Sequence, residues 1–422
     1  MRLARVTTLL TFLAAVFLAG AVGAGAQTTI RFVKWPGANY DPALDPDVAI
    51  VEAFNRANPD VQVELDVIPN YQEVLMVQLA GGIYPDLLRV NPGMIPEFQP
   101  FGLLEELSPY VERSGAFIAD LWPIATTSKE IFGGLYAIPI TIGPNALYYN
   151  VSAFNEAGLQ SPHELHRQNN WHWETFLTAA RRLTIDRTGD GRPDIYGYKG
   201  SPQNWPIFVV SARGKIYTDD GKRLLVDDAA MDALEFLRSL IYDHGVWTIQ
   251  PPYYTEAFPQ GLAAMIIAQP RYVNLYREQA QIEWDTAVVM GRTPDMPFQE
   301  RFRLGGISLA APSAHKEAGW RFIQHFLSYE SQLRYAESGE VPMNRQAAAA
   351  LLTADPSKPP QNLHVFMETL ERAIPSPDPV VPASVTNALN RELNKVWNRG
   401  EPVRTVIDGA RPIIDALLAE QP

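Results

Sequence analysis

Cysteine is absent from the 422 residues of this chain. Its absence excludes disulfide bonds, thiolate metal sites, cysteine nucleophiles and a lipid-modified cysteine at a processing site. Common catalytic motifs are missing as well. The seven histidines form no His-Glu-x-x-His pair, and there is neither a Gly-x-Ser-x-Gly elbow nor a Gly-x-x-x-x-Gly-Lys loop. We therefore expect neither catalysis nor a cofactor.

Beyond the N-terminus, the chain lacks any apolar run long enough to cross a membrane. Residues 1–26 resemble an export signal, in which Arg2 and Arg5 precede an apolar stretch and residues 24–26 (AGA) form a small-residue cleavage pattern. An uncleaved membrane anchor is the alternative, but no basic stop follows the small residues. We expect cleavage before Gln27 and a periplasmic protein without a lipid anchor.

Basic residues are outnumbered, because 35 lysines and arginines face 47 acidic residues and the formal net charge is −12. Proteins that bind nucleic acid present a basic patch or stripe, so we expect no nucleic-acid partner. The length exceeds what one compact core accommodates and suits two domains. Many of the nine tryptophans and 17 tyrosines lie in segments rich in Pro and Gly. Such aromatics form either small satellite cores or the walls of a binding cleft.

Strand and helix patterns alternate at the start of the mature chain. We predict strands at 28–34, 61–67 and 86–90, and helices at 48–58 and 71–80. This alternation is typical of α/β organisation. A proline-dense segment at 375–382 precedes two terminal helices. These terminal helices are 383–398 and 403–419, and the helices predicted from apolar residues at helical spacing are 173–183, 227–242 and 316–327.

Six segments, in order along the chain, resemble the extracellular solute-binding proteins of sugar ABC importers, the group that includes maltose-binding protein. Each segment alone is a weak signal, but six in the family's order across the mature chain form a specific one. The segments are 54–63 (FNRANPDVQV), 79–87 (LAGGIYPDL), 134–139 (GLYAIP) with 147–159, 171–184 (beginning WHWETF), 261–265 (GLAAM) and 305–322 (beginning GGISLA).

The resemblance implies a two-lobed α/β periplasmic-binding-protein fold, type II-like, with crossing hinge strands and a ligand cleft between the lobes. A cleft between domains is also the usual place for a small-molecule site. The first crossing is expected just after Pro139, the return near 305–309 and a third passage around Pro375. The expected parts are the signal peptide 1–26, lobe 1 at 27–141 and 308–372, and lobe 2 at 142–307 and 373–422.

Three expected ligand contacts lie in lobe 1 or the returning segment. Trp35 follows the first strand, at the edge where an α/β sheet opens onto its ligand crevice, although it could instead cap the core of the lobe. Asn91 follows the strand 86–90, where the resemblance places a polar side chain that bonds sugar hydroxyls. Gly306 lies in the segment that returns from lobe 2.

Four further ligand contacts are expected from lobe 2. Asn145 lies where the family places a polar contact, and its amide suits a hydroxyl, although a turn-forming role is equally compatible. Trp205 resembles the stacking aromatic of the second lobe. Trp247 and Tyr254 are additional candidates, and packing at the end of the preceding helix is the alternative role of Trp247.

Arg271, the last expected ligand contact, marks a departure from the maltose-type pattern. In that pattern a Gly-Pro-Trp stretch supplies a stacking tryptophan, whereas residues 269–271 are Gln-Pro-Arg here. Arg271 either stacks on a sugar, pairs with a carboxylate or phosphate of the ligand, or bonds an acidic neighbour as an ordinary helix-start arginine. The departure weakens any claim that the ligand is maltose.

A loop that begins at Asp186 resembles a calcium loop, but Gly197 stands where the bidentate glutamate of position twelve is expected. We favour a tight polar turn without metal. The side chains at positions one, three, five and nine are Asp186, Thr188, Asp190 and Asp194.

The expected function is that of a monomeric, periplasmic solute-binding protein that delivers a mono- or oligosaccharide, or a related polyol, to the permease subunits of an ABC importer. One alternative is an exported carbohydrate-active enzyme that uses two carboxylates, although no acid–base pair is recognisable. The other is the same scaffold with an anionic solute, such as a sugar phosphate, or with a metal ion. The tyrosine pairs 148–149 and 253–254 motivate the metal version, as in ferric-ion binders.

Overall fold

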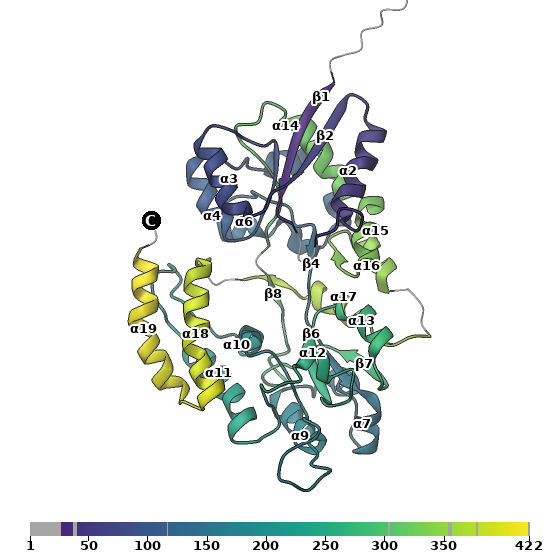
Figure 1. Ribbon diagram of the computed structural model, residues 1–422, viewed down its shortest axis with the longest axis vertical. Coiled ribbons are helices and arrows are strands. Elements are labelled where there is room, and N and C mark those ends of the chain that lie inside the picture. The colour runs from purple at the N-terminus through teal and green to yellow at the C-terminus, as the bar shows by residue number, and fades with distance from the viewer. Residues whose placement is uncertain are drawn as a thin grey trace, which may run out of the picture.

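Two lobes joined by extended crossing segments make up the protein (Figure 1). The structure is a computed structural model that describes residues 27–36, 40–115, 117–302, 304–352, 357–376 and 379–420. The export signal predicted at 1–26 lies outside these residues. Within them, no helix has both the length and the apolar character that a membrane span requires.

The sheet of the upper lobe has the strand order β2-β1-β3-β9. Strands β1 (Thr28–Lys34), β2 (Val61–Val67) and β3 (Leu87–Val90) are parallel, and β9 (Gly306–Leu309) runs antiparallel to β3. Parallel neighbours need a crossover, which helices α2 (Pro46–Ala57) and α3 (Tyr71–Ala80) supply. These elements confirm the predicted α/β organisation of the mature N-terminus.

The side chains of β1 alternate between two apolar cores. Ile30 and Phe32 join one core, where Phe32 contacts Phe322 at 5.6 Å between ring centroids, whereas Val33 joins the core on the other face. Phe322 belongs to α14 (Lys316–Phe326), a helix predicted from its apolar spacing. The sheet is therefore covered on both faces, as parallel strands require.

The lower lobe is built around the three-stranded sheet β6-β5-β7. Strands β6 (Met265–Ala268) and β7 (Trp284–Ala287) both run antiparallel to β5 (Ala146–Asn150), and all three strands are buried along their whole length. The long helices of this lobe are α9 (Trp173–Leu183), α11 (Asp228–Tyr242), α18 (Ala383–Arg399) and α19 (Val403–Ala419).

Three segments pass between the lobes, close to the places that the family resemblance implies. Figure 1 shows β4 (Thr141–Ile142) and β8 (Arg301–Phe302) in this region. β4 pairs with β10 (Val341–Pro342), and β8 pairs with β11 (Ile374–Pro375). We call these short paired segments the hinge region, after the hinge strands that the resemblance implies.

Helix α17 (His364–Glu371) contributes to both lobes. Val365 and Phe366 belong to the core of the lower lobe, whereas Leu370 belongs to that of the upper lobe. The predicted lobe boundaries stay a prediction. Further helices are α4 (Met94–Phe98), α5 (Ser108–Arg113), α6 (Ser128–Phe132), α7 (Val151–Glu156), α8 (Pro162–Arg167), α10 (Trp205–Ser211), α12 (Tyr254–Ala257), α13 (Tyr272–Gln279), α15 (Tyr329–Glu337) and α16 (Arg345–Leu352).

Candidate functional site

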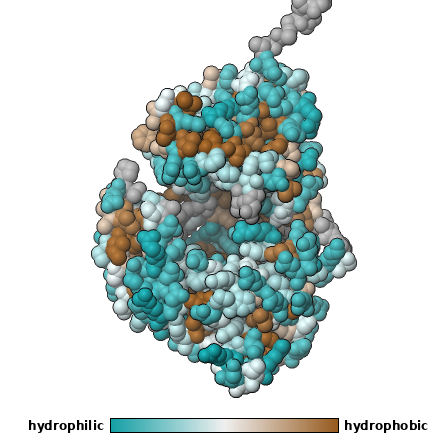
Figure 2. Space-filling model, viewed as in Figure 1, coloured by the Kyte–Doolittle hydropathy of each residue, from teal (hydrophilic) through white to brown (hydrophobic). Residues whose placement is uncertain are grey.

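The space between the lobes is hollowed, as Figure 2 shows. A cavity of about 430 Å³ opens beside the upper lobe, and we call it the Trp35 cavity. A second cavity of about 230 Å³, the Arg271 cavity, lies against the hinge strand β4, and Glu340 lines both. A third, of about 660 Å³, lies between Phe132 of the upper lobe and Asp219 of the lower lobe, beside Pro375. Together these three cavities form the candidate cleft.

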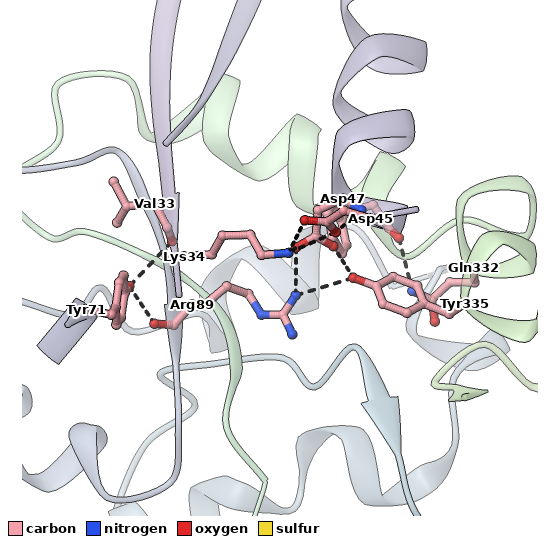
Figure 3. Close-up of polar contacts among 9 residues, drawn as sticks. Val33, Lys34, Asp45, Asp47, Tyr71, Arg89, Gln332 and Tyr335 are labelled. Atoms are coloured by element: carbon pink, nitrogen blue, oxygen red, sulfur yellow. Dashed lines mark hydrogen bonds and ion pairs between the residues drawn. The ribbon is translucent and has the colours of Figure 1, made fainter. Parts of the chain in front are cut away.

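A buried charge network forms one wall of the Trp35 cavity (Figure 3). Asp47, which is 0% exposed, lies 2.5 Å from the Lys34 ammonium and 3.2 Å from Nη1 of Arg89. Tyr335 donates a hydrogen bond to Asp47 from a helix almost 300 positions away in sequence. Asp45 caps the start of α2 and also holds the Lys34 ammonium, at 2.9 Å.

The network keeps Asp47 and Arg89 ionised. Burial alone would raise the pKa of Asp47, but the positive charges of Arg89 and Lys34 outweigh it, so that this pKa lies below its ordinary value. Burial alone would lower the pKa of Arg89, but its contacts with Tyr335 and Asp47 raise it. Figure 3 shows the second terminal nitrogen of Arg89 pointing away from Asp47 and Tyr335. Arg89 thus enters the cavity as a fixed, charged donor.

Trp35 presents a flat apolar surface beside this donor. Its ring packs edge-on against Tyr71, with 5.5 Å between centroids, and the guanidinium carbon of Arg89 lies 5.7 Å from the Trp35 ring. The Tyr71 hydroxyl in turn donates to the backbone carbonyl of Arg89 at 2.7 Å. An aromatic ring held in place beside a charged donor suits a ligand with one apolar face and polar edges.

Arg271 and Tyr254 come together on the lower lobe. Arg271 is exposed, lines the Arg271 cavity, and has its guanidinium carbon 5.3 Å from the ring of Tyr272. Burial and the neighbouring Tyr272 raise the pKa of Tyr254 to about 12. The cleft therefore has a cation on both sides, Arg89 with Trp35 above and Arg271 below, whereas Tyr254 and Tyr272 line none of the three cavities.

Asn145 is tied to the hinge rather than open to the cleft. Its backbone N–H and its side-chain amide each donate to a carboxylate oxygen of Glu300 at 3.0 Å. Glu300 immediately precedes β8, and its own carbonyl accepts a hydrogen bond from Ile374 of β11. The Asn145–Glu300 contact thus joins the start of β5 to two of the crossing segments.

Glu300 makes the stability of the hinge region depend on pH. Burial raises its pKa from 4.5 to about 7, although the two hydrogen bonds from Asn145 oppose the rise. A folded-state pKa above the unfolded value gives stability that is complete below pH 4.5 and is lost as the pH rises through 7.

Replacing Glu300 by glutamine should make the protein more stable at pH 8 by about 1–3 kcal/mol. The same replacement should reduce the loss of unfolding free energy that the wild type shows between about pH 5 and pH 8. Rotation of the Asn145 amide allows the glutamine to keep both hydrogen bonds. Urea unfolding of wild type and variant at these two pH values measures the effect. Glu52→Gln, at an exposed glutamate, is the control. An unchanged pH profile in Glu300→Gln would show that Glu300 titrates normally.

Four other predicted contacts are enclosed by the protein's own residues. The Asn91 side chain accepts hydrogen bonds from the backbone N–H groups of Gly93 and Met94 at the start of α4. Trp205 is 6% exposed and donates to Asn390 at 2.8 Å, and Trp247 is 2% exposed. A Cβ at Gly306 would lie 2.0 Å from the carbonyl oxygen of Ile138 in the crossing segment. Ligand contact by these residues stays a prediction.

The Trp35 cavity is also lined by residues that the sequence did not single out, among them Lys34, Arg89, Tyr335 and Glu340. A charged residue inside the otherwise apolar strand 87–90 was a usable signal, because a buried arginine needs a partner. No sequence pattern pairs Arg89 with Tyr335.

The loop that resembles a calcium site bonds its own backbone. Asp186 accepts from the N–H groups of Gly189 and Gly191, and Asp194 accepts from those of Arg187 and Thr188. The bond from Gly191 is the largest cause that lowers the pKa of Asp186. Across the described part of the chain, no three His, Asp or Glu side chains are placed to hold a metal ion.

A family model for bacterial extracellular solute-binding proteins matches residues 42–333. The chain belongs to this family. Its members are non-catalytic solute-binding proteins, which confirms both the family resemblance and the expectation that the chain is not an enzyme. This membership sets aside the carbohydrate-active enzyme as an alternative.

Relatives share the fold of this solute-binding protein at low identity. A putative binding protein of Brucella abortus (strain 2308) is 24% identical over 334 residues, 75% of this chain and 77% of that one. The sugar-binding protein MalE from Xanthomonas citri is 22% identical and superposes with a TM-score of 0.76, over 93% of this chain and 98% of that one. An ABC substrate-binding protein from Listeria monocytogenes, in complex with cycloalternan, is 21% identical with a TM-score of 0.71, over 94% and 100%. The predicted two-lobed α/β periplasmic-binding-protein fold is confirmed.

Proposed function

We propose that this solute-binding protein binds a mono- or oligosaccharide in the cleft between its lobes and delivers it to the permease of an ABC importer. The observation that carries the proposal is the pairing of Trp35 with the fixed guanidinium of Arg89 in a cavity of the candidate cleft. The names of two structural relatives, a MalE sugar-binding protein and a protein bound to cycloalternan, point to the same ligand class. We place the mature protein in the periplasm as a monomer, released by cleavage after residue 26.

Sugar rings fit this arrangement for a physical reason. One face of the ring is a sheet of C–H groups, and a flat indole opposite it buries apolar area while the hydroxyls turn outward. One such platform contributes about 1–2 kcal/mol. Arg89 is held by Asp47 and Tyr335, so it donates to a hydroxyl without having to be ordered first.

Closure follows from binding to both lobes. A ligand between Trp35 above and Arg271 below gains contacts in the closed state that the open state lacks, so its binding shifts the population toward closure. The short hinge pairs β4–β10 and β8–β11 leave few bonds to rearrange. The importer then recognises the closed form.

A thermal-shift panel of monosaccharides, oligosaccharides, polyols and sugar phosphates tests the ligand class. A ligand at a hundred times its dissociation constant stabilises the folded state by about 2.7 kcal/mol, which raises the melting temperature measurably. Stabilisation by neutral sugars supports the proposal. Stabilisation by sugar phosphates alone would replace it with the anionic-solute alternative, and no shift by any of them would remove carbohydrates as the ligand class.

A further inference from the structure

A cavity of about 600 Å³ lies outside the cleft, between α8 and α17. It shares no lining residue with the three cleft cavities. Three of the seven histidines of the chain line it, together with two arginines. The residues of this histidine cavity are His163, His166, Arg167, Asn169, Pro297, His364, Glu368 and Arg372.

His163, one of the residues that line this cavity, has an unmet hydrogen-bonding group. Its Nδ1 atom is buried and has no hydrogen-bond partner among the described residues. The His163 ring meets that of His364 edge to face, with 5.4 Å between centroids. A buried polar atom without a partner is costly, and a bound ligand that accepts a hydrogen bond would relieve the cost.

The one carboxylate in the wall is already paired. Glu368 lies 2.8 Å from Nε2 of His166 and 2.9 Å from a guanidinium nitrogen of Arg372. Arg167 is exposed and has no ion-pair partner within the described part of the chain. The wall thus offers cationic and imidazole donors without a free anion to match them.

The charges around His163 disfavour a metal cation and favour an anion. The pKa of His163 is lowered by burial first and then by the positive charges of His364, Arg167 and His166, while Asp285 of β7 opposes the change. A bound anion would reverse the electrostatic part of this shift, because it stabilises the imidazolium. A metal ion would meet two guanidinium groups at close range.

We propose that the histidine cavity is a second binding site, separate from the cleft, and that it takes a small oxyanion, either a phosphate-like or a carboxylate group. Arg167 and Arg372 supply guanidinium forks of the kind that bind such groups, and His163, whose Nδ1 lacks a partner, lies in the same wall. The groups that face His163 or the ligand are His166, Arg167, His364, Glu368, Arg372 and Asp285. Because His163 gains charge when it is protonated, binding strengthens as the pH falls through its range.

Titration calorimetry on the full mature protein tests this site with two probes, sodium sulfate and sodium succinate, against sodium chloride at equal ionic strength. Sulfate keeps its charge between about pH 6 and pH 8, so a pH effect reports the protein groups. We expect saturable sulfate binding that is about tenfold tighter at the lower pH. If succinate binds more tightly than sulfate, the preferred group is a carboxylate. If sulfate binds more tightly, the preferred group is a phosphate-like oxyanion. Absence of saturable binding by both probes overturns the proposal.

Variants locate the binding. Arg167→Gln and Arg372→Gln should each weaken sulfate binding by about tenfold, because a charge-assisted hydrogen bond is lost. Arg404→Gln, an exposed arginine on α19, is the matched control and should bind like the wild type. The imidazole ¹⁵N signals of His163 should move during the sulfate titration. Unchanged affinity in both cavity variants, or unmoved His163 signals with binding present, would place the anion elsewhere.

Discussion

Replacing Asp47 by alanine should lower the free energy of unfolding by about 3–5 kcal/mol. Asp47 is completely buried and neutralises both Lys34 and Arg89, so its loss leaves Arg89 without an anionic partner. Asp45 still holds Lys34, whereas the carboxylate that pairs with Arg89 is that of Asp47. The destabilisation is an effect of an uncompensated buried charge and not a measure of the net worth of the ion pair.

Urea unfolding measures this change, and the double variant Asp47→Ala/Arg89→Met serves as control because it removes the unpaired charge as well. The double variant should recover part of the loss. The pH dependence of stability is a second test of the role of Asp47. The folded-state pKa of Asp47 is lowered from 3.8, so its stabilisation is present above that value and is lost as the pH falls through the folded pKa. If the free energy of unfolding of Asp47→Ala lies within about 1 kcal/mol of the wild-type value, the network contributes little to stability.

Replacing Gly306 by alanine should destabilise the protein by about 3 kcal/mol or more. The new Cβ would lie 2.0 Å from the carbonyl oxygen of Ile138, which is backbone and does not rotate away. Strand β9 is held between β3 on one side and the Ile138 bridge on the other, so it has no free direction in which to move.

Gly409, inside helix α19, is a control for Gly306. A Cβ at Gly409 would meet nothing within 4 Å, so Gly409→Ala should leave stability unchanged or raise it by up to about 1 kcal/mol. Chemical unfolding of both variants compares the two sites under one protocol. Equal stability of Gly306→Ala and Gly409→Ala would contradict the close approach of β9 to the crossing segment.

Local patterns predicted the elements of the fold well. Strand β1, helix α3 and helix α19 have the predicted bounds, because alternation, helical spacing and glycine or proline stops are properties of neighbouring residues. Helix α2 begins two residues before its predicted start, because Asp45 caps it and Pro46 occupies the first turn. The order of six family segments predicted the two-lobed arrangement that no single segment carries.

The cleft was harder to predict, because its walls join residues that are distant in sequence. Trp35 was predicted from its position after a strand and Arg271 from the family pattern from which it departs, and both line cleft cavities. The partners of Arg89 are Asp47 and Tyr335, and nothing in the sequence specifies how 335 meets 89 in space. Trp205 donates a hydrogen bond to Asn390 of the terminal helix α18. The spacing of residues along the chain does not show that this helix lies beside Trp205.

The central claim, that a carbohydrate is held between the two lobes, is tested most directly by the dissociation constant of one binding oligosaccharide for wild type, Trp35→Ala and Arg271→Ala. Trp35 belongs to the upper lobe and Arg271 to the lower, so binding between the lobes predicts that each substitution weakens affinity by about 1–3 kcal/mol. Exposed Tyr329→Ala and Arg404→Ala, which line no cleft cavity described above, should bind like the wild type. Weakening by only one of the two cleft substitutions, or by neither, would contradict a ligand that bridges the lobes.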